Sequence, residues 1–180
     1  MLQDDFQILL DQIIEQGDIE ISDIPNIDLY MDQVITIFEN ALGSSKRYPE
    51  DKLLTKTMIN NYTKDKILMP AINKKYTSEH ILQMALIYHL KQTLSIADIK
   101  SIFQHSLHHN EVNVEEVYQE FVDLKRQQSK LINDQVQEVE LGVSNTEHHP
   151  KEKTLLNILI LIHHANTYKR LAEKMIDQLK

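Results

Sequence analysis

The sequence lacks cysteine and tryptophan, and among its 180 residues only 3 are glycine and 4 are proline. Without cysteine there can be no disulfide, no thiolate metal site and no thiol nucleophile, which suits a reducing cytoplasm. Strand-rich folds need many turn residues, so the scarcity of glycine and proline favours helices joined by short loops. We therefore expect an all-α (mainly helical) protein, built as one domain or as one domain with a helical appendage.

Long apolar runs are also missing. The most apolar stretch, Leu155–Ile162, is far shorter than the about 20 residues that a membrane-spanning helix needs. The N-terminus carries Asp4 and Asp5 and no basic segment, so it does not resemble a signal peptide. These features predict a soluble, cytoplasmic protein with no membrane partner.

Basic residues are absent from the first 45 positions, which hold ten acids. From Lys46 to Lys75, by contrast, eight basic residues stand against three acids, although the net charge of the chain is −8. Salt screens charges beyond about 10 Å, so the local field over a binding face matters more than the total. The acidic total therefore does not exclude a nucleic-acid partner.

Apolar residues recur at helical spacing in most of the chain and predict helices near residues 6–14, 29–42, 55–65, 78–90, 95–103, 114–140 and 153–179. Asp28, Thr55 and Ser95 are the expected N-terminal caps, and Gly43 is the expected end of the second helix. Between the helices, three segments have other patterns. We expect an extended linker at 19–25, a short two-stranded wing at 69–77 and a second linker at 142–150.

The stretch LLTKTMINNYTKDKILMP and the residues after it resemble the DNA-binding region of MerR-type regulators. In that family the second helix follows V-S-x-x-T-(L/I)-R-Y-Y-E-x-x-G-L-L-x-P, a hairpin ends in R-x-Y, and a later helix begins S-(L/I)-x-x-I-K. The positions that match are Leu54-Thr55, Ile59, Tyr62, Ile67-Leu68, Pro70, Lys74, Tyr76, Ser95-Ile96 and Ile99-Lys100. The sequence departs from the pattern where Asn60 replaces the phosphate-binding Arg, Asn61 the first Tyr, Met58 the Thr and Lys66 the Gly.

The combination LYMDQV, LTKTMINNYTK and KKYTSEHI also resembles a bacterial family classed as a domain of unknown function in low-GC Gram-positive bacteria. Together the resemblances imply a winged helix-turn-helix over residues 23–109, with a small β-hairpin wing. Residues 1–22 then form an N-terminal helix and linker. Residues 110–180 form a C-terminal helical region for dimerisation or packing.

The chemistry of the residues agrees with this implied function. Side chains at 56, 57, 60, 61 and 64 fall on one face of the predicted helix, opposite Ile59 and Tyr62. Asn can bond adenine in the major groove, and Lys can bind guanine or a phosphate. The predicted DNA-binding residues are Thr55, Lys56, Thr57, Asn60, Asn61, Tyr62, Lys64, Lys74, Lys75 and Tyr76.

The histidines offer a weaker candidate site, for a metal ion. His105, His108 and His109 share a helical surface, and Glu111 or His80 would be needed to complete a zinc site; a polar helix end explains the same pattern. His163 and His164 are open to the same two interpretations. No glycine-rich phosphate loop, nucleophile elbow or HExxH motif is present, so we predict no enzyme activity and no cofactor.

Two functions from different classes follow. The first is a DNA-binding transcriptional regulator that binds double-stranded DNA as a homodimer, with residues 111–180 joining the two copies. The second is a non-enzymatic helical interaction module that uses the winged domain to bind a protein partner. The acidic residues 1–45 would suit a basic protein partner. A small-molecule sensor in the C-terminal helices, lined by Leu156, Leu159 and Ile162, is a third possibility, but a packing core explains these residues as well.

Overall fold

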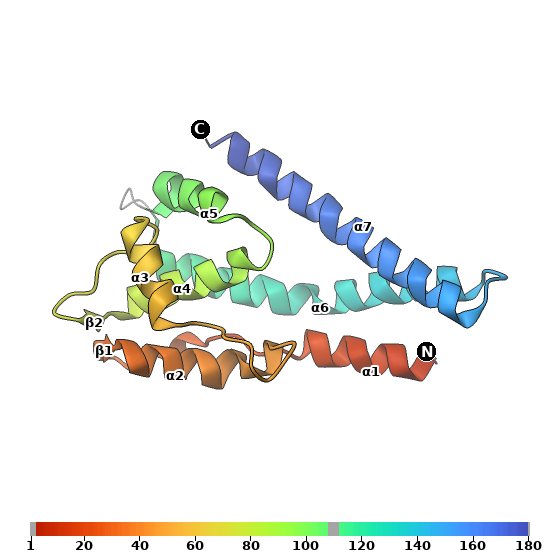
Figure 1. The fold of residues 1–180 in the computed structure, drawn as a ribbon, viewed down its shortest axis with the longest axis horizontal. Helices are drawn as coiled ribbons and strands as arrows, with labels where there is room; N and C mark the ends of the chain where they lie inside the picture. Colours follow the sequence, from red (N-terminus) through yellow and green to blue (C-terminus); the bar gives the residue numbers. More distant parts are fainter. Residues whose placement is uncertain (1–2, 108–111, 180) are drawn as a thin grey trace. The chain divides into compact units, whose positions relative to one another are not determined.

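The structure is a computed structural model and describes residues 3–107 and 112–179. Over these residues, seven α-helices account for most of the chain and one small antiparallel sheet has two strands (Figure 1). The expected mainly helical fold is therefore confirmed. The chain divides into two compact units: unit 1 comprises Met1–Glu15 with Asp123–Lys174, and unit 2 comprises Gln16–Val122 with Met175–Lys180.

Unit 2 contains the sheet and the shorter helices. In chain order these are β1 (Leu29–Tyr30), α2 (Met31–Leu42), α3 (Lys56–Lys64), β2 (Lys75–Tyr76), α4 (Ser78–Lys91), α5 (Ile96–Ile102) and the start of α6 (Val114–Ser144). Three short turns of other helical types lie at Ile21–Asp23, Gly43–Ser45 and Phe103–Leu107.

The core of unit 2 is built around α4. This helix buries residues on nearly every side, among them Ile81, Met84, Ala85 and Ile87, which is typical of a helix enclosed by its neighbours. α2 contributes one stripe at four-residue spacing, Val34, Phe38 and Leu42. The same core includes residues from Ile19 to Val122, so it draws on almost the whole of unit 2.

The prediction for the start of α2 was wrong. Asp28 does not cap the helix, because Leu29 and Tyr30 form β1 and the helix begins only at Met31. Leu29 is buried and lies opposite Tyr76 in β2, while the backbone N–H of Tyr30 donates to the side chain of Gln33 (2.8 Å). A pairing partner 47 positions away thus overrides the local helix signal. The expected end at Gly43 is confirmed, since α2 ends at Leu42.

Residues 19–25 are not a free linker either. Ile19 is completely buried and its carbonyl accepts a hydrogen bond from the Tyr118 hydroxyl (2.9 Å). Ile24 is also buried in the core, and a short helical turn lies between them. At Gly17 the chain passes so close to α2 that an added Cβ would lie 3.1 Å from the Ala41 carbonyl oxygen. The segment is therefore a fixed part of unit 2.

Unit 1 consists of α1 (Gln3–Ile14), the larger part of α6 and most of α7 (Pro150–Asp177). Gln7 links α1 to α6, because its amide donates to Asn133 (3.1 Å) and its carbonyl accepts from Gln137 (2.7 Å). The predicted linker begins later than expected, since α6 continues through Gly142 to Ser144 and α7 begins at Pro150.

Candidate nucleic-acid interface

Helix α3 separates an apolar side from a polar side. Thr55 caps its N-terminus by accepting a hydrogen bond from the backbone N–H of Met58 (3.1 Å), as the sequence predicted. Ile59 and Tyr62 are buried in the core of unit 2. The opposite side is exposed and carries Lys56, Thr57, Asn60, Asn61 and Lys64. The structure thus brings together on one exposed face five of the ten predicted site residues.

A left-handed residue ends α3. Lys66 has a φ of 58°, and beyond it the backbone N–H groups of Ile67 and Leu68 both donate to the Tyr62 carbonyl (2.9 and 3.1 Å). Such a position favours glycine, which is the residue that the MerR-type pattern places there. Ile67 and Leu68 are then buried and anchor the chain before the wing.

The wing is a tight hairpin. Ile72 and Lys75 exchange two backbone hydrogen bonds (3.0 and 2.9 Å), and the two residues between them, Asn73 and Lys74, have φ values of 52° and 64°. Two successive left-handed residues define the turn type that matches the twist of a hairpin. Both turn residues are exposed, so the side chain of Lys74 is presented to solvent at the tip.

The wing pairs with a segment that the sequence did not indicate. After the turn, β2 pairs on its other side with β1, so that Tyr30 lies opposite Lys75. The Lys75 ammonium sits 5.3 Å from the centre of the exposed Tyr30 ring. Sequence reasoning missed Tyr30, because nothing local to it signals a contact with a residue so far along the chain.

The two predicted site tyrosines lie in the core. Tyr62 and Tyr76 are only 6% and 5% exposed, and burial raises the pKa of both above the usual 10.0. Thr55 and Lys75 are partly exposed, and the other six predicted residues are fully at the surface. The two tyrosine rings therefore pack in the core of unit 2 and do not belong to its exposed surface.

His80 holds the wing against α4. Its Nδ1 lies 3.2 Å from the backbone N of Thr77 and 2.7 Å from the Thr77 hydroxyl, and its Nε2 lies 3.3 Å from the Pro70 carbonyl oxygen. The Thr77 N–H needs an acceptor, so the ring proton belongs on Nε2, which donates to Pro70. This buried histidine is a structural tie, and it is not available as the metal ligand that the sequence left open.

The positive charge around α3 is smaller than the basic residues between Lys46 and Lys75 suggest, because acids of α2 neutralise two of them. Asp32 of α2 forms an ion pair with Lys56 (2.7 Å), and Glu39 of the same helix forms one with Lys46. Both acids precede the basic window in the sequence but lie beside it in the fold. Lys64 and Lys74 are exposed and form no ion pair with another described residue, so within the predicted site they are available for an external anion.

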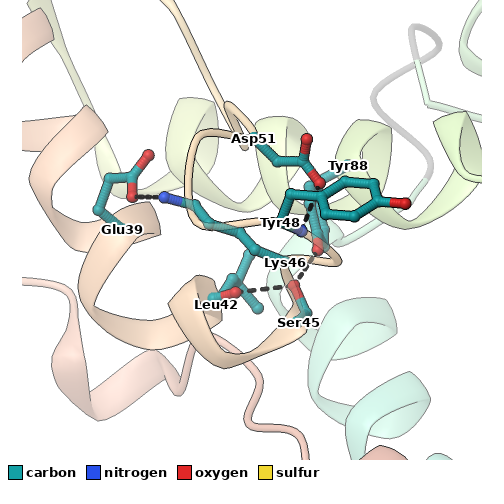
Figure 2. Close-up of polar contacts among 7 residues, drawn as sticks. All are labelled: Glu39, Leu42, Ser45, Lys46, Tyr48, Asp51 and Tyr88. Carbon is teal, nitrogen blue, oxygen red and sulfur yellow. Dashed lines mark hydrogen bonds and ion pairs between the residues drawn. The ribbon is translucent and has the colours of Figure 1, made fainter.

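The loop between α2 and α3 is held in place by hydrogen bonds within the loop and by one to α4 (Figure 2). The Ser45 hydroxyl donates to the Leu42 carbonyl (2.7 Å) and lies 2.5 Å from the Tyr88 hydroxyl of α4. The backbone N–H of Tyr48 donates to Asp51 (3.0 Å), and the exposed ring of Tyr48 lies under the Arg47 guanidinium at 5.3 Å. These contacts fix the path of the loop between α2 and α3, which is long for the turn of a helix-turn-helix.

The other histidines do not form a metal centre within the described part of the chain. No group of three His, Asp or Glu side chains there could hold a metal ion. His108, His109 and Glu111 lie outside the described residues. His163 and His164 line a shallow hollow in unit 1 with Glu138. Nor is any of the described helices long and apolar enough to cross a membrane.

Comparison with known families gives a match to the segment that contains α3 and the wing. A model described as "Domain of unknown function (DUF1836)" matches residues 19–121, which is more than half of the chain. The chain belongs to the DUF1836 family. The DUF1836 segment begins at the buried Ile19 and includes the sheet, α3, the wing and the first turns of α6. Searches among curated proteins and among solved structures gave no match.

Proposed function

We propose that the DUF1836 domain binds double-stranded DNA through α3 and the wing, and that the protein is a transcriptional regulator. The observation that carries this proposal is the exposed face of α3, where Lys56, Thr57, Asn60, Asn61 and Lys64 stand opposite a buried apolar side. Amide and ammonium groups on one face of a helix are the chemistry that contacts base edges and phosphates in a major groove.

The wing supports the proposal through its charge. Lys74 stands at the exposed tip of a hairpin whose base is fixed by β1 and by His80, so its ammonium is carried on a rigid support. A cation in that position suits a phosphate beside the groove. The left-handed Lys66 adds a backbone feature that the MerR-type pattern meets with glycine, which supports a winged helix-turn-helix of that kind.

A salt series on the intact protein tests the proposal. Genomic fragments retained by the protein would be sequenced, and the enriched duplex would be used for fluorescence anisotropy between about 50 and 200 mM salt. We expect affinity to fall steeply with salt, because phosphate contacts release counterions. Lys64→Ala and Lys74→Ala should each weaken binding and lower the salt slope by about 1.

The matched control is Lys130→Ala, which removes an equally exposed cation from α6 in unit 1. It should leave the affinity unchanged. If no duplex is bound at low salt, or if Lys64→Ala and Lys74→Ala behave like the control, DNA binding through this face is wrong.

A protein partner is the second candidate, and two observations favour it. Asp32 neutralises Lys56 at one end of the α3 face, which reduces its attraction for phosphate. Near the wing, Ile27, Tyr30 and Ile72 are all more than half exposed, and apolar side chains of that kind suit a protein surface better than a phosphate backbone. Binding of a protein that weakens little with salt, together with no retained DNA, would favour this function.

A further inference from the structure

A small polar cavity lies in unit 1, beside the turn that joins α6 to α7 (Figure 1). We call it the α6–α7 cavity, and its volume is about 180 Å³. Its lining residues come from the end of α6, the turn and the first turns of α7, and Phe6 of α1 completes it. Six of the eight lining residues carry polar side chains, so the cavity is suited to a polar molecule.

Asn157 of α7 is the lining residue that most clearly calls for a partner. Its side chain is only 7% exposed, and its buried Oδ1 has no hydrogen-bond partner among the described residues. Buried amide oxygens in proteins are nearly always paired, because an unpaired one costs free energy. Since the amide borders the cavity and its last side-chain torsion is soft, this oxygen can turn to a donor held there.

Opposite charges also line the cavity without neutralising each other. Glu140 and Lys153 are partly buried, and neither forms an ion pair with another described residue. One oxygen of Glu140 accepts from the Ser144 hydroxyl (2.5 Å), which leaves the other oxygen for a further donor. The Lys153 ammonium donates to the Ser144 carbonyl (2.6 Å) and retains further protons to donate. The cavity thus offers a negative acceptor and a positive donor to one molecule.

The volume restricts that molecule to a small one. Liquid water takes about 30 Å³ per molecule, so a cavity of about 180 Å³ has room for roughly six non-hydrogen atoms. A ligand with an ammonium and a carboxylate in so few atoms is an amino acid of the size of glycine, alanine or serine. Phe6 and Pro150 supply the apolar part of the lining, which suits a short side chain.

We propose that the α6–α7 cavity binds a small free amino acid. Glu140 and Asn157 accept hydrogen bonds from its ammonium, and Lys153 donates to its carboxylate. This site goes beyond DNA binding and does not depend on it, since the cavity lies in unit 1 whereas α3 and the wing lie in unit 2.

The cavity also differs from the sensor site that the sequence left open. That site was to be lined by Leu156, Leu159 and Ile162, and none of the three lines the cavity. Leu159 and Ile162 are 54% and 56% exposed. The structure thus favours a polar ligand over the apolar one that those residues suggested.

A ligand-observed NMR titration of the full-length protein tests the class of ligand. The probes are glycine, L-alanine and L-serine, with propionate and ethylamine as analogues of alanine that lack the ammonium and the carboxylate respectively. We expect saturable binding of at least one amino acid. Both analogues should bind at least roughly tenfold more weakly, because each lacks one of the two charged groups. Binding of none of the amino acids, or equal binding of either analogue, would overturn the proposal.

A charge-removing variant locates the binding in the cavity. Glu140→Gln keeps the size of the side chain but removes its charge, so it should weaken binding of the amino acid at least roughly tenfold. It should not weaken binding of propionate, which has no ammonium. The matched control is Glu138→Gln, the same change at an exposed carboxylate of α6 that does not line the cavity. Equal affinities of the two variants for the amino acid would contradict the site.

Asn157→Leu separates binding from folding. Leu is close to Asn in size and has no polar atom to satisfy, so the free energy of unfolding in urea should not fall. The variant should nevertheless bind the amino acid at least roughly tenfold more weakly than the wild type. A stable Asn157→Leu protein with unchanged affinity would overturn the proposal. The comparison of alanine with its two analogues needs no variant, so it decides the ligand class even if Asn157→Leu does not fold.

Discussion

His80 is the residue on which the position of the wing depends most directly. It is 2% exposed and satisfies the Thr77 N–H on one side and the Pro70 carbonyl on the other. His80→Ala would remove both of these partly buried hydrogen bonds, leave a cavity where the buried ring was, and remove a ring that packs edge-on against Tyr76. We expect a loss of about 2–4 kcal/mol in the free energy of unfolding, measured by urea denaturation.

The control for His80 is Asn60→Ala, an equally simple truncation at an exposed position of α3. It should change the free energy of unfolding by no more than about 0.5 kcal/mol, because Ala is the better helix former. A loss for His80→Ala as small as that of the control would show that the two hydrogen bonds contribute little.

Tyr62 gives the fold a dependence on alkaline pH. Burial raises its pKa above 10.0, so the folded state retains the phenol proton when the unfolded chain releases it. The contribution is fully present below pH 10 and is lost as the pH rises through the higher pKa of the folded state. Unfolding of Tyr62→Phe, which has no ionisable hydroxyl, should therefore be compared with that of the wild type at several pH values. We expect the wild type to lose stability relative to Tyr62→Phe above pH 10, and parallel curves there would contradict this explanation.

At the scale of elements, the turn after α3 carries a strain that a single change should remove. Lys66 is exposed and holds a φ of 58°, a conformation that disfavours any residue with a Cβ. Lys66→Gly should raise the free energy of unfolding by about 1 kcal/mol. The change also removes a cation, so DNA affinity should stay the same or fall slightly while stability rises. The control Lys64→Gly, inside the helix, should lower stability by about 1 kcal/mol instead.

The elements also divide into those that local sequence predicts and those that it does not. Thr55 and Ser95 were identified as caps because a hydroxyl before an amphipathic run satisfies free N–H groups within the same turn. The strand at Leu29–Tyr30 was missed because its partner lies at Lys75–Tyr76, and strand pairing across such a distance leaves no local pattern.

The candidate site follows the same division. The polar face of α3 is a matter of spacing along one helix, and the sequence predicted it in full. The ion pair of Asp32 with Lys56 joins two helices and could not be read from a charge window that begins at Lys46. Tyr62 and Tyr76 were predicted to contact DNA and lie in the core, because a pattern of residue types does not say how deeply a ring is buried.

At the scale of the whole molecule, unit 2 contains what an independent domain needs. Every member of its core cluster lies between Ile19 and Val122, and the hydrogen bond from Tyr118 to Ile19 ties the two ends of that segment together. We therefore expect the fragment Gln16–Val122 to fold alone and to unfold cooperatively in urea.

A shorter fragment tests whether the segment before β1 belongs to the domain. A fragment of residues 28–122 keeps the sheet and all of α2–α5 but removes Ile19 and Ile24. These two side chains are buried in the core, with only 0% and 8% of their surface exposed. Loss of two such side chains from a packed core should cost several kcal/mol, with each contributing about 2–5 kcal/mol. We expect the shorter fragment to unfold at a much lower urea concentration than Gln16–Val122, or not to fold. Equal urea midpoints for the two fragments would mean that residues 19–25 only cover the core and that the core packs without them.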